Sequence, residues 1–330
     1  MKRVLAGLAA LAALAALLLA LFLIFRTPDT DPAAMRAKYA AAPSQFVALA
    51  DGRRIHLRDE GPRGGTPIVL LHGSNADLHT WQPWTDRLSK THRVIRFDQR
   101  GHGLTGPAED EGDTRAAFAR DVDQLADKLG LERFILAGNS MGGGIALEYA
   151  LTYPDRVAGL VLVDAAGAPR IGEAKGNIGF TLARTPGFSW LMGQITPRGL
   201  VERSLRQSVA NQAIVTDAMV DRYWELLRYP GNRQATAQRF AAAQQPFSPE
   251  ALARLKGTPT LIIWGERDGL IPLASGRWLA QQIPGAKFEV LRGIGHIPME
   301  EAPGVSAELV ERWLEQGATP AAPASSAPPA

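Results

Sequence analysis

Ser140 is the residue whose surroundings most favour nucleophilic chemistry. It is the middle residue of Gly138-Asn139-Ser140-Met141-Gly142, which follows a short apolar run and leads into a helical pattern. This G-x-S-x-G spacing predicts a strand, a sharp turn and a helix, with the serine hydroxyl exposed at a strained apex. The glycines leave the space that a Cβ atom would fill. The alternative is a glycine-rich turn with an idle serine.

A serine hydroxyl is a weak nucleophile, so it needs a histidine base, which an acid orients in turn. When such a turn carries the nucleophile, the chain order is serine, acid, histidine. Only His296 follows Ser140, in the glycine-bearing loop 292–298 beyond the last expected strand, and we therefore expect it to be the base. The histidines that precede the serine are His56, His72, His79, His92 and His102.

Two aspartates between Ser140 and His296 end expected strands, namely Asp164 and Asp268. We favour Asp268 as the acid and keep Asp164 as the alternative. Glu266 is less favoured, because its longer side chain would meet the histidine from a different depth. The other aspartates considered lie at a turn or on expected helical faces, where solvation is the simpler role: Asp155, Asp217 and Asp221.

Two backbone amides are expected to stabilise the oxyanion of an acyl-transfer reaction. The Met141 amide opens the helix after the serine and is free to donate. The second donor is expected in His72-Gly73-Ser74-Asn75, with the Ser74 amide turned inward. An ordinary glycine turn is the alternative there. His72 is expected to brace this loop, and Asp98 and His102 to pin the loop 97–103 by hydrogen bonds.

Composition narrows the class of protein. The chain has 330 residues, enough for one large α/β domain with an insertion and terminal extras. Its 36 Lys and Arg against 33 Asp and Glu give a net charge of +3 without basic runs, so no nucleic-acid partner is expected. The absence of cysteine excludes disulfides and thiol nucleophiles. No set of residues resembles a catalytic zinc site, so we expect no metal.

Alternating strands and helices must position these residues. Asp51-Gly52 lies between two short apolar runs and predicts a hairpin, so the domain is expected to begin near Gln45. Strands that alternate with helical stretches predict a mostly parallel sheet covered on both faces, with its chemistry at the carboxyl ends of the strands. Further strand-like runs lie at 68–73, 93–98, 134–139, 157–164, 260–264 and 288–291.

The strand rhythm stops between Ala165 and Pro249, where helical segments predict a cap over residues 165–250. The cap would divide the α/β core into residues 45–164 and 251–316. Extra helices packed on the sheet, with no substrate role, are the alternative. An apolar cap favours a substrate with an acyl chain or an aromatic group. Its apolar residues include Phe180, Phe188, Trp190, Leu191, Met192, Tyr223, Trp224, Leu226 and Leu227.

Both termini differ from the domain between them. Lys2 and Arg3 precede an uncharged stretch, residues 4–25, whose helix would rise about 33 Å and cross a bilayer. We expect residues 1–26 to be an uncleaved single-pass anchor, with a cleaved signal as the alternative. Basic residues before the span favour a catalytic domain on the extracytoplasmic side of a bacterial inner membrane. Residues 27–44 read as a tether and residues 317–330 as a disordered Ala, Pro and Ser tail.

Residues 46–314 resemble the α/β-hydrolase fold superfamily. The resemblance implies an eight-stranded sheet, a helical cap after the sixth strand and no cofactor. It also implies the triad Ser140, Asp268 and His296, with the Ser74 and Met141 amides as the oxyanion hole. A serine at the apex argues against haloalkane dehalogenases and epoxide hydrolases, which use an aspartate there. The motifs are His72-Gly73, Asp98-Gln99-Arg100-Gly101-His102-Gly103, Gly138 to Gly143, Gly265-Glu266-Arg267-Asp268 and Gly295-His296.

The expected activity is that of a membrane-anchored serine hydrolase acting on small carboxylic esters through an acyl-enzyme. The sequence around Ser140, from Gly138 to Gly143, also looks like that of hydrolases that cleave carbon-carbon bonds in ring-cleavage products of aromatic degradation. Those enzymes follow the histidine with tryptophan and have a more glycine-rich loop after His-Gly. This chain has Ile297 and Ser74-Asn75-Ala76 instead, as many esterase-like members do. A third reading is a ligand sensor of this fold with a slow triad.

Overall fold

An eight-stranded sheet forms the centre of the protein in the computed structural model, which describes residues 2–108, 112, 114–169, 171, 193–242 and 245–317. The strand order is β1-β2-β4-β3-β5-β6-β7-β8, and all strands from β3 onward run parallel, whereas β2 is antiparallel to both neighbours. The expected mostly parallel α/β-hydrolase sheet is confirmed. The strands are β1 Gln45–Ala48, β2 Arg54–Glu60, β3 Ile68–Leu71, β4 Val94–Phe97, β5 Phe134–Asn139, β6 Val157–Val163, β7 Thr260–Gly265 and β8 Lys287–Leu291.

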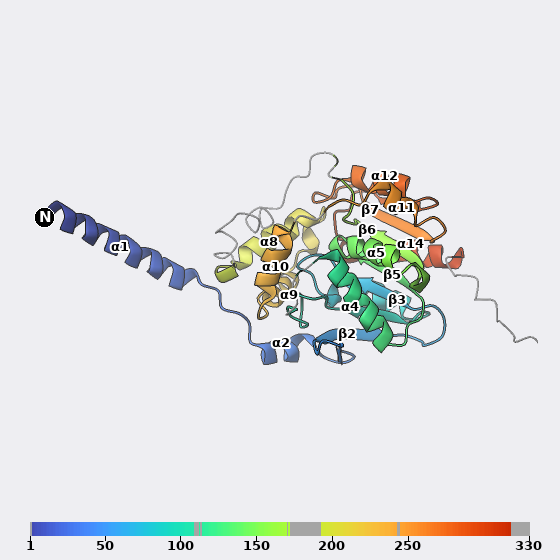
Figure 1. Ribbon diagram of the computed structural model, residues 1–330, viewed down its shortest axis with the longest axis horizontal. Coiled ribbons are helices and arrows are strands. Elements are labelled where there is room, and N and C mark those ends of the chain that lie inside the picture. The colour runs from blue at the N-terminus through green and yellow to red at the C-terminus, as the bar shows by residue number, and fades with distance from the viewer. Residues whose placement is uncertain are drawn as a thin grey trace, which may run out of the picture.

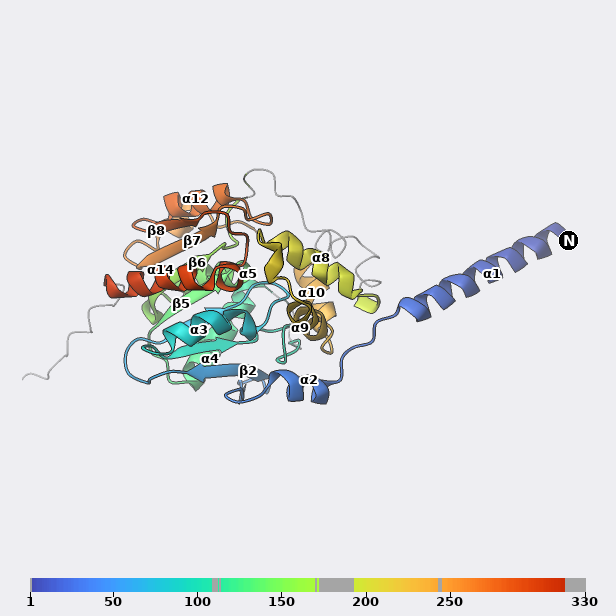
Figure 2. The same cartoon turned by 180° about the vertical axis from the view of Figure 1, so that it is seen from behind.

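Helices cover both faces of the sheet, which explains why the central strands are continuous apolar runs. Every residue of β3, β5, β6 and β7 is buried. Figure 1 shows α4, α5 and α12 over one face, and Figure 2 shows α3 and α14 over the other. These helices are α3 Gln82–Leu88, α4 Arg115–Lys128, α5 Met141–Thr152, α12 Leu273–Gln282 and α14 Pro303–Glu315. The short α11 Pro249–Ala253 and α13 Pro298–Glu301 complete the core helices.

Three described α-helices follow β6 within the segment expected to form a cap, and we call them the cap. They are α8 Arg198–Ser208, α9 Asp217–Leu227 and α10 Asn232–Ala241. Their apolar side chains, among them Val201, Leu205 and Val220, share one buried cluster with core residues such as Met299. The cap therefore packs firmly on the core. The expected cap residues Phe180, Phe188, Trp190, Leu191 and Met192 lie outside the described residues, as does the expected tail from residue 318 onward.

Helix α1, Lys2–Phe25, projects away from the body of the protein on the side of the cap (Figures 1 and 2). It is long and apolar enough to cross a membrane, with a mean hydropathy of 3.0 and none of its most apolar window buried. A helix that is apolar all round needs an apolar environment, and the described part of the protein does not bury this one.

Residues 27–44, which we call the strap, are packed against the domain rather than extended as a simple tether. They contain α2, Pro32–Tyr39, which begins where the Asp31 side chain accepts a hydrogen bond from the Ala34 amide. Met35 is buried, and it clusters with Leu104 of the core and Leu226 of the cap. The strap therefore shares a small apolar core with both parts of the domain.

Polar contacts also hold the strap on the cap. The Thr27 amide donates to the Gln194 carbonyl (2.9 Å), and Arg233 of α10 donates to the Thr27 carbonyl (2.8 Å). Arg233 also pairs with Asp29. Glu225 of α9 accepts a hydrogen bond from Lys38 (2.7 Å) at the far end of the strap. Thr27 lies two residues after the end of α1, so the chain between the apolar helix and its first contact with the cap is very short.

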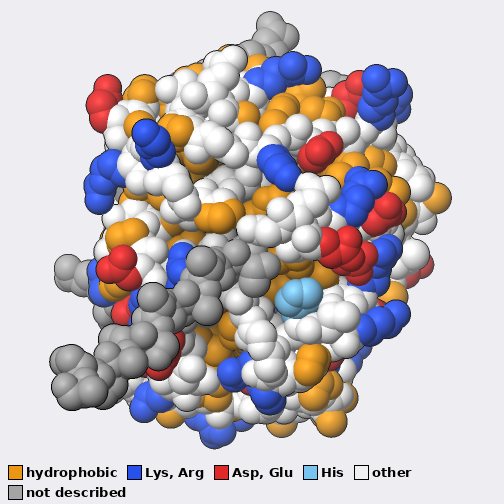
Figure 3. Space-filling model, turned by 90° about the vertical axis from the view of Figure 1, so that its right-hand side faces the viewer, with side chains coloured by type: hydrophobic (Ala, Val, Ile, Leu, Met, Phe, Trp, Pro, Cys, Tyr) orange, Lys and Arg blue, Asp and Glu red, His pale blue; other side chains and the backbone are white. Residues whose placement is uncertain are grey.

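The end of the molecule opposite α1 has charges of both signs interspersed with apolar and neutral groups (Figure 3). This face therefore presents no broad basic surface of the kind that binds nucleic acid.

Candidate active site

Ser140 lies at a strained turn between β5 and α5, as the motif predicts. Its backbone has φ 53° and ψ −117°, a conformation that non-glycine residues rarely adopt. A Cβ on Gly138 would lie 2.2 Å from the Gly142 carbonyl oxygen, and one on Gly142 would lie 2.3 Å from the Leu71 carbonyl oxygen. Only glycine fits at these two positions, so close backbone packing holds the serine at the apex.

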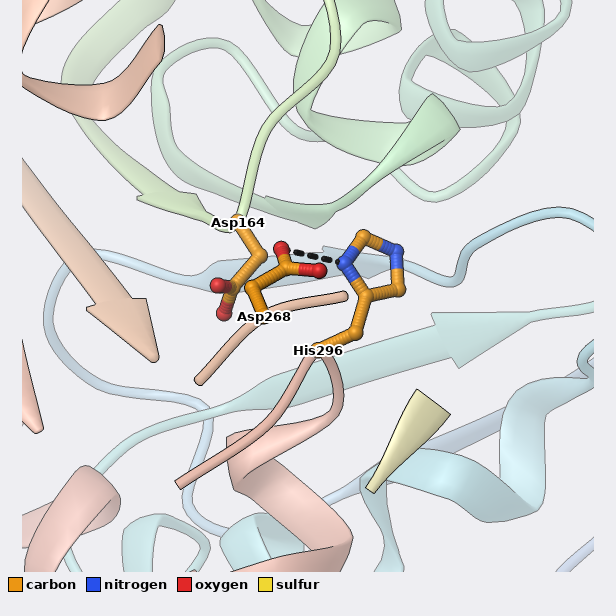
Figure 4. Close-up of side chains that lie close together, drawn as sticks. All are labelled: Asp164, Asp268 and His296. Carbon is orange, nitrogen blue, oxygen red and sulfur yellow. Dashed lines mark hydrogen bonds and ion pairs between the residues drawn. The ribbon is translucent and has the colours of Figure 1, made fainter. Parts of the chain in front are cut away.

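His296 and Asp268 are joined by a hydrogen bond of 2.7 Å between Nδ1 and Oδ2 (Figure 4). Both are buried, with 5% and 9% of their surfaces exposed, so water screens the pair little. Because a carboxylate only accepts, the bond requires the proton on Nδ1 and leaves Nε2 as the acceptor. Figure 4 shows Nε2 on the side of the ring away from both aspartates.

The Asp268 carboxylate is itself fixed by the backbone. Its Oδ1 accepts hydrogen bonds from the amides of Leu270 (2.7 Å) and Ile271 (3.0 Å). These bonds hold the carboxylate in place and leave Oδ2 for the histidine.

Asn139 connects the serine turn to the histidine loop, a role that our sequence reading missed. Its side-chain amide donates to the carbonyl oxygens of His296 (3.0 Å) and Val163 (3.2 Å). A polar residue at the end of an otherwise apolar strand was the one available signal. Asn139, the residue before Ser140, therefore links the serine turn to the loop that carries His296.

Glu301 and Ser208 were also missed, and they attach the histidine loop to the cap. Glu301 accepts hydrogen bonds from the amides of Gly295 (2.8 Å) and Ala210 (2.9 Å). The His296 amide donates to the Ser208 carbonyl at 2.7 Å. The loop that carries the imidazole thus rests on the C-terminal end of α8.

Asp164, the alternative acid, lies next to Asp268 in the same cluster of side chains. One carboxylate oxygen of Asp164, one of Asp268 and one ring nitrogen of His296 all lie within 4.8 Å of one another (Figure 4). The hydrogen bond to His296 comes from Asp268, whereas Asp164 accepts one from the Gly265 amide (2.9 Å). Burial, together with the nearby Asp268 carboxylate, raises the pKa of Asp164 well above its usual value.

The two residues whose amides are the expected oxyanion donors, Ser74 and Met141, are in side-chain contact. Met141 is the first residue of α5, so its amide has no partner within the helix. The Ser74 hydroxyl contacts the Met141 sulfur at 3.4 Å. A Cβ on Gly73 would lie 3.2 Å from Cβ of Ser140, which places the loop after β3 directly against the serine turn.

His72, Asp98 and His102 hold loops, as expected. His72 donates from Nδ1 to the Gly73 carbonyl (2.8 Å) and accepts from the Gln99 amide (3.1 Å). Burial lowers the pKa of His72, and it lowers that of His102 further, so both rings are neutral braces. Asp98 accepts from the amides of Leu78 and Leu104, both at 2.8 Å.

The family model for the α/β hydrolase fold matches residues 66–303. The chain therefore belongs to the α/β hydrolase fold family. Its sequence is 30% identical to 2-hydroxymuconate semialdehyde hydrolase from Pseudomonas sp. (strain CF600), over 81% of this chain and 93% of that protein.

Two solved structures resemble the protein closely. A thermophilic esterase from Thermogutta terrifontis is 27% identical with a TM-score of 0.69, and the likeness covers 83% of this chain and 99% of that one. A membrane phospholipase A described as a bacterial virulence factor is 25% identical with a TM-score of 0.70. That likeness covers 96% of this chain and 99% of the phospholipase, so it extends into α1.

Proposed function

We propose that the protein is a serine hydrolase that cleaves carboxylic esters through an acyl-enzyme. The observation that carries the proposal is the buried His296–Asp268 pair, whose loop is hydrogen-bonded to Asn139, the residue preceding the strained Ser140. This is the arrangement that activates a serine hydroxyl in triad enzymes.

In the proposed reaction, Oγ of Ser140 attacks the ester carbonyl while Nε2 of His296 takes the hydroxyl proton. The amides of Ser74 and Met141 donate to the oxyanion, and collapse of the intermediate releases the alcohol with the proton from His296. Water then attacks the acyl-enzyme with His296 again as base, and cleavage of the bond to Oγ of Ser140 releases the carboxylic acid while His296 returns the proton to Oγ. Asp268 keeps the imidazole in the required tautomer and stabilises its charged form.

The proposed substrates are esters with an apolar acyl or aromatic part. The apolar character of the cap, whose Val201 and Leu205 share a buried cluster with the core, supports such groups. The likeness to an esterase and to a membrane phospholipase A supports ester chemistry.

A fluorophosphonate probe tests the proposal, because it labels only an activated serine. We expect the full chain in detergent to be labelled at Ser140, and Ser140→Ala to be unlabelled although folded. Hydrolysis of p-nitrophenyl esters is expected to survive EDTA, since the proposed steps use no metal. A correctly folded wild-type chain that is never labelled would favour a ligand sensor.

Carbon-carbon bond hydrolysis is the second candidate, because a 2-hydroxymuconate semialdehyde hydrolase is 30% identical. The same serine, histidine and acid would serve it. Turnover of a conjugated dienol-keto acid by the purified chain, compared with p-nitrophenyl esters of several chain lengths, separates the two. A higher kcat/KM for the keto acid than for every ester would replace the ester proposal.

We also propose that α1 anchors the enzyme in the bacterial inner membrane with the domain on the extracytoplasmic side. The length and hydropathy of α1, and a likeness to a membrane phospholipase that reaches into it, support an anchor. Alkaline phosphatase fused at the C-terminus matures only after export and should be active in a Gram-negative host. An active cytoplasmic reporter at that position, with inactive phosphatase, would reverse the orientation.

A further inference from the structure

Asp164 is a second carboxyl group behind the proposed triad acid, and its position is strictly fixed. It follows β6 with a left-handed φ of 45°, and its side chain is fully buried. Its Oδ1 accepts the amide hydrogen of Gly265, the last residue of β7 before the turn that carries Asp268. Asp164 therefore touches both the backbone and the side chain of the segment that presents the acid.

The other oxygen of Asp164 does not fit an ionised group. Oδ2 is buried, and no donor among the described residues gives it a hydrogen bond. Its near neighbours include the Asp268 carboxylate, within the 4.8 Å cluster. Two ionised carboxylates at that distance would repel each other in a site with little water, whereas a protonated Oδ2 can donate to its neighbour.

The surroundings decide which of the two carboxyl groups holds the proton. Asp268 receives two backbone amides and the imidazole Nδ1–H, and Asp164 receives one amide. Three donors stabilise the charge on Asp268 more than one donor does on Asp164. Burial, Asp268 and the more distant Glu301 all raise the pKa of Asp164, consistent with this division.

We propose that Asp164 is a neutral carboxylic acid whose Oδ2–H donates to the Asp268 carboxylate and holds it in register with His296. Asp164 is thus a positioning residue that acts through Asp268, and this inference rests on the proposed triad. The catalytic assembly becomes a chain of four side chains from Ser140 to Asp164.

Substitutions at Asp164 test the positioning role. Asp164→Asn keeps an N–H donor in the place of Oδ2–H and an acceptor for Gly265, so kcat/KM should stay within about threefold of wild type. Asp164→Ala removes the donor and should lower kcat by roughly 10- to 100-fold, as loss of supporting hydrogen bonds does at other sites. Asp155→Asn, at an exposed turn, is the matched control and should change nothing. Activity is normalised to the fraction of serine that a fluorophosphonate titrates.

The pH dependence of stability tests the protonation state without requiring any activity. A folded-state pKa above the unfolded value of about 3.9 means that the folded chain binds the extra proton, so stability falls as pH rises toward the folded pKa. Asp164→Asn removes this loss. Its folding equilibrium constant relative to wild type should therefore increase from pH 5 to pH 8, by up to about tenfold per pH unit.

Several results would overturn the inference. Full activity of Asp164→Ala would exclude positioning, and a pH-independent stability difference for Asp164→Asn would exclude the neutral acid. If Asp164→Asn abolishes hydrolysis while Asp268→Asn lowers it only slightly, Asp164 is the triad acid itself. Stoichiometric divalent metal in the purified chain, lost in both Asp164 variants, would make the cluster a metal site. Failure of the wild type to react with fluorophosphonate would instead contradict the proposed function and leave the stability test valid.

Discussion

The serine turn and the contacts of the cap are held together by different physical means. At the turn, backbone packs on backbone, inside the motif at Gly138 and against Leu71 of β3 at Gly142, and both positions require glycine. Around the cap, side chains join residues far apart in sequence, such as Lys38 with Glu225, which are 187 positions apart. The first kind of contact can be recognised in the sequence from a short glycine motif, whereas the second depends on the whole fold.

The largest effect is expected at the turn itself. Ser140→Ala and His296→Ala should each lower kcat/KM on the order of 10⁶-fold, because a triad acts as a unit. Thermal unfolding of Ser140→Ala should be nearly unchanged, whereas His296→Ala should lower Tm because it leaves the buried Asp268 carboxylate without its imidazole partner. Residual hydrolysis at a tenth of the wild-type rate in either variant would refute the triad mechanism.

The same substitution should have opposite effects in the two regions. Gly138→Ala forces the backbone of the serine turn apart. It should lower kcat/KM by about 100-fold or more, since small misplacements of reacting groups slow the reaction strongly. Gly199→Ala, in cap helix α8, meets no atom within 4 Å and should instead stabilise the protein by about 0.5 to 1 kcal/mol. Assays and unfolding curves on the two variants check this, and equal behaviour would erase the distinction.

The next largest effect is expected from a buried ion pair between the core and the cap, which should stabilise the folded protein. Arg222 of α9 lies 3.3 Å from Asp77 of the core, and Asp77 is fully buried. Burial alone would raise the pKa of Asp77, but Arg222 and His79 hold it below its usual value. Asp77→Asn should therefore cost on the order of 3 kcal/mol at pH 7, because Arg222 then keeps only Glu300 as an ion partner and the hydrogen bonds from His79 lose a charged acceptor.

This contribution should depend on pH with a defined sign. A depressed carboxyl pKa gives stability that is present above the unfolded value of about 3.9 and is lost as pH falls below it. Urea unfolding of Asp77→Asn and wild type at pH 7 and pH 3 measures the difference. A gap that does not narrow at pH 3 would show that the carboxylate charge is not its source.

The smallest effect concerns the strap. A soluble chain that begins at Gln45 lacks Met35 and exposes its apolar partners, which should cost about 2 kcal/mol relative to a chain that begins at Thr27. Met35→Ala in the longer chain should fall between the two. Thermal unfolding of the three proteins checks the order, and equal stability would mean that the strap contacts contribute nothing.

Much of the fold follows from the sequence because the periodicities are strong. The buried runs of β3 and β6 and the hairpin at Asp51-Gly52 lie where they were expected. The motif also predicts the strained serine, because glycines at fixed spacing serve a local geometry. The histidine follows from chain order alone.

The rest depends on distances that no local pattern encodes. Asp164 and Asp268 both end strands, and only the pairing of β6 with β7 brings them to one site and gives the histidine to Asp268. Prolines and charges suggested a tether at residues 27–44, but the partners of Met35 lie in the core and in the cap. Asn139 and Glu301 act through bonds across the fold, so their types alone did not reveal them.

The docked strap changes what a membrane anchor would do for this enzyme. A free chain of the 18 residues from 27 to 44 would let the domain wander over about 23 Å. Bonding of Thr27 to Gln194, two residues after α1 ends, removes that freedom. With α1 in a bilayer, as proposed, the cap would face the lipid at a constant height and tilt. Encounters with substrates in the same leaflet would then follow lateral diffusion in two dimensions instead of a search through a volume.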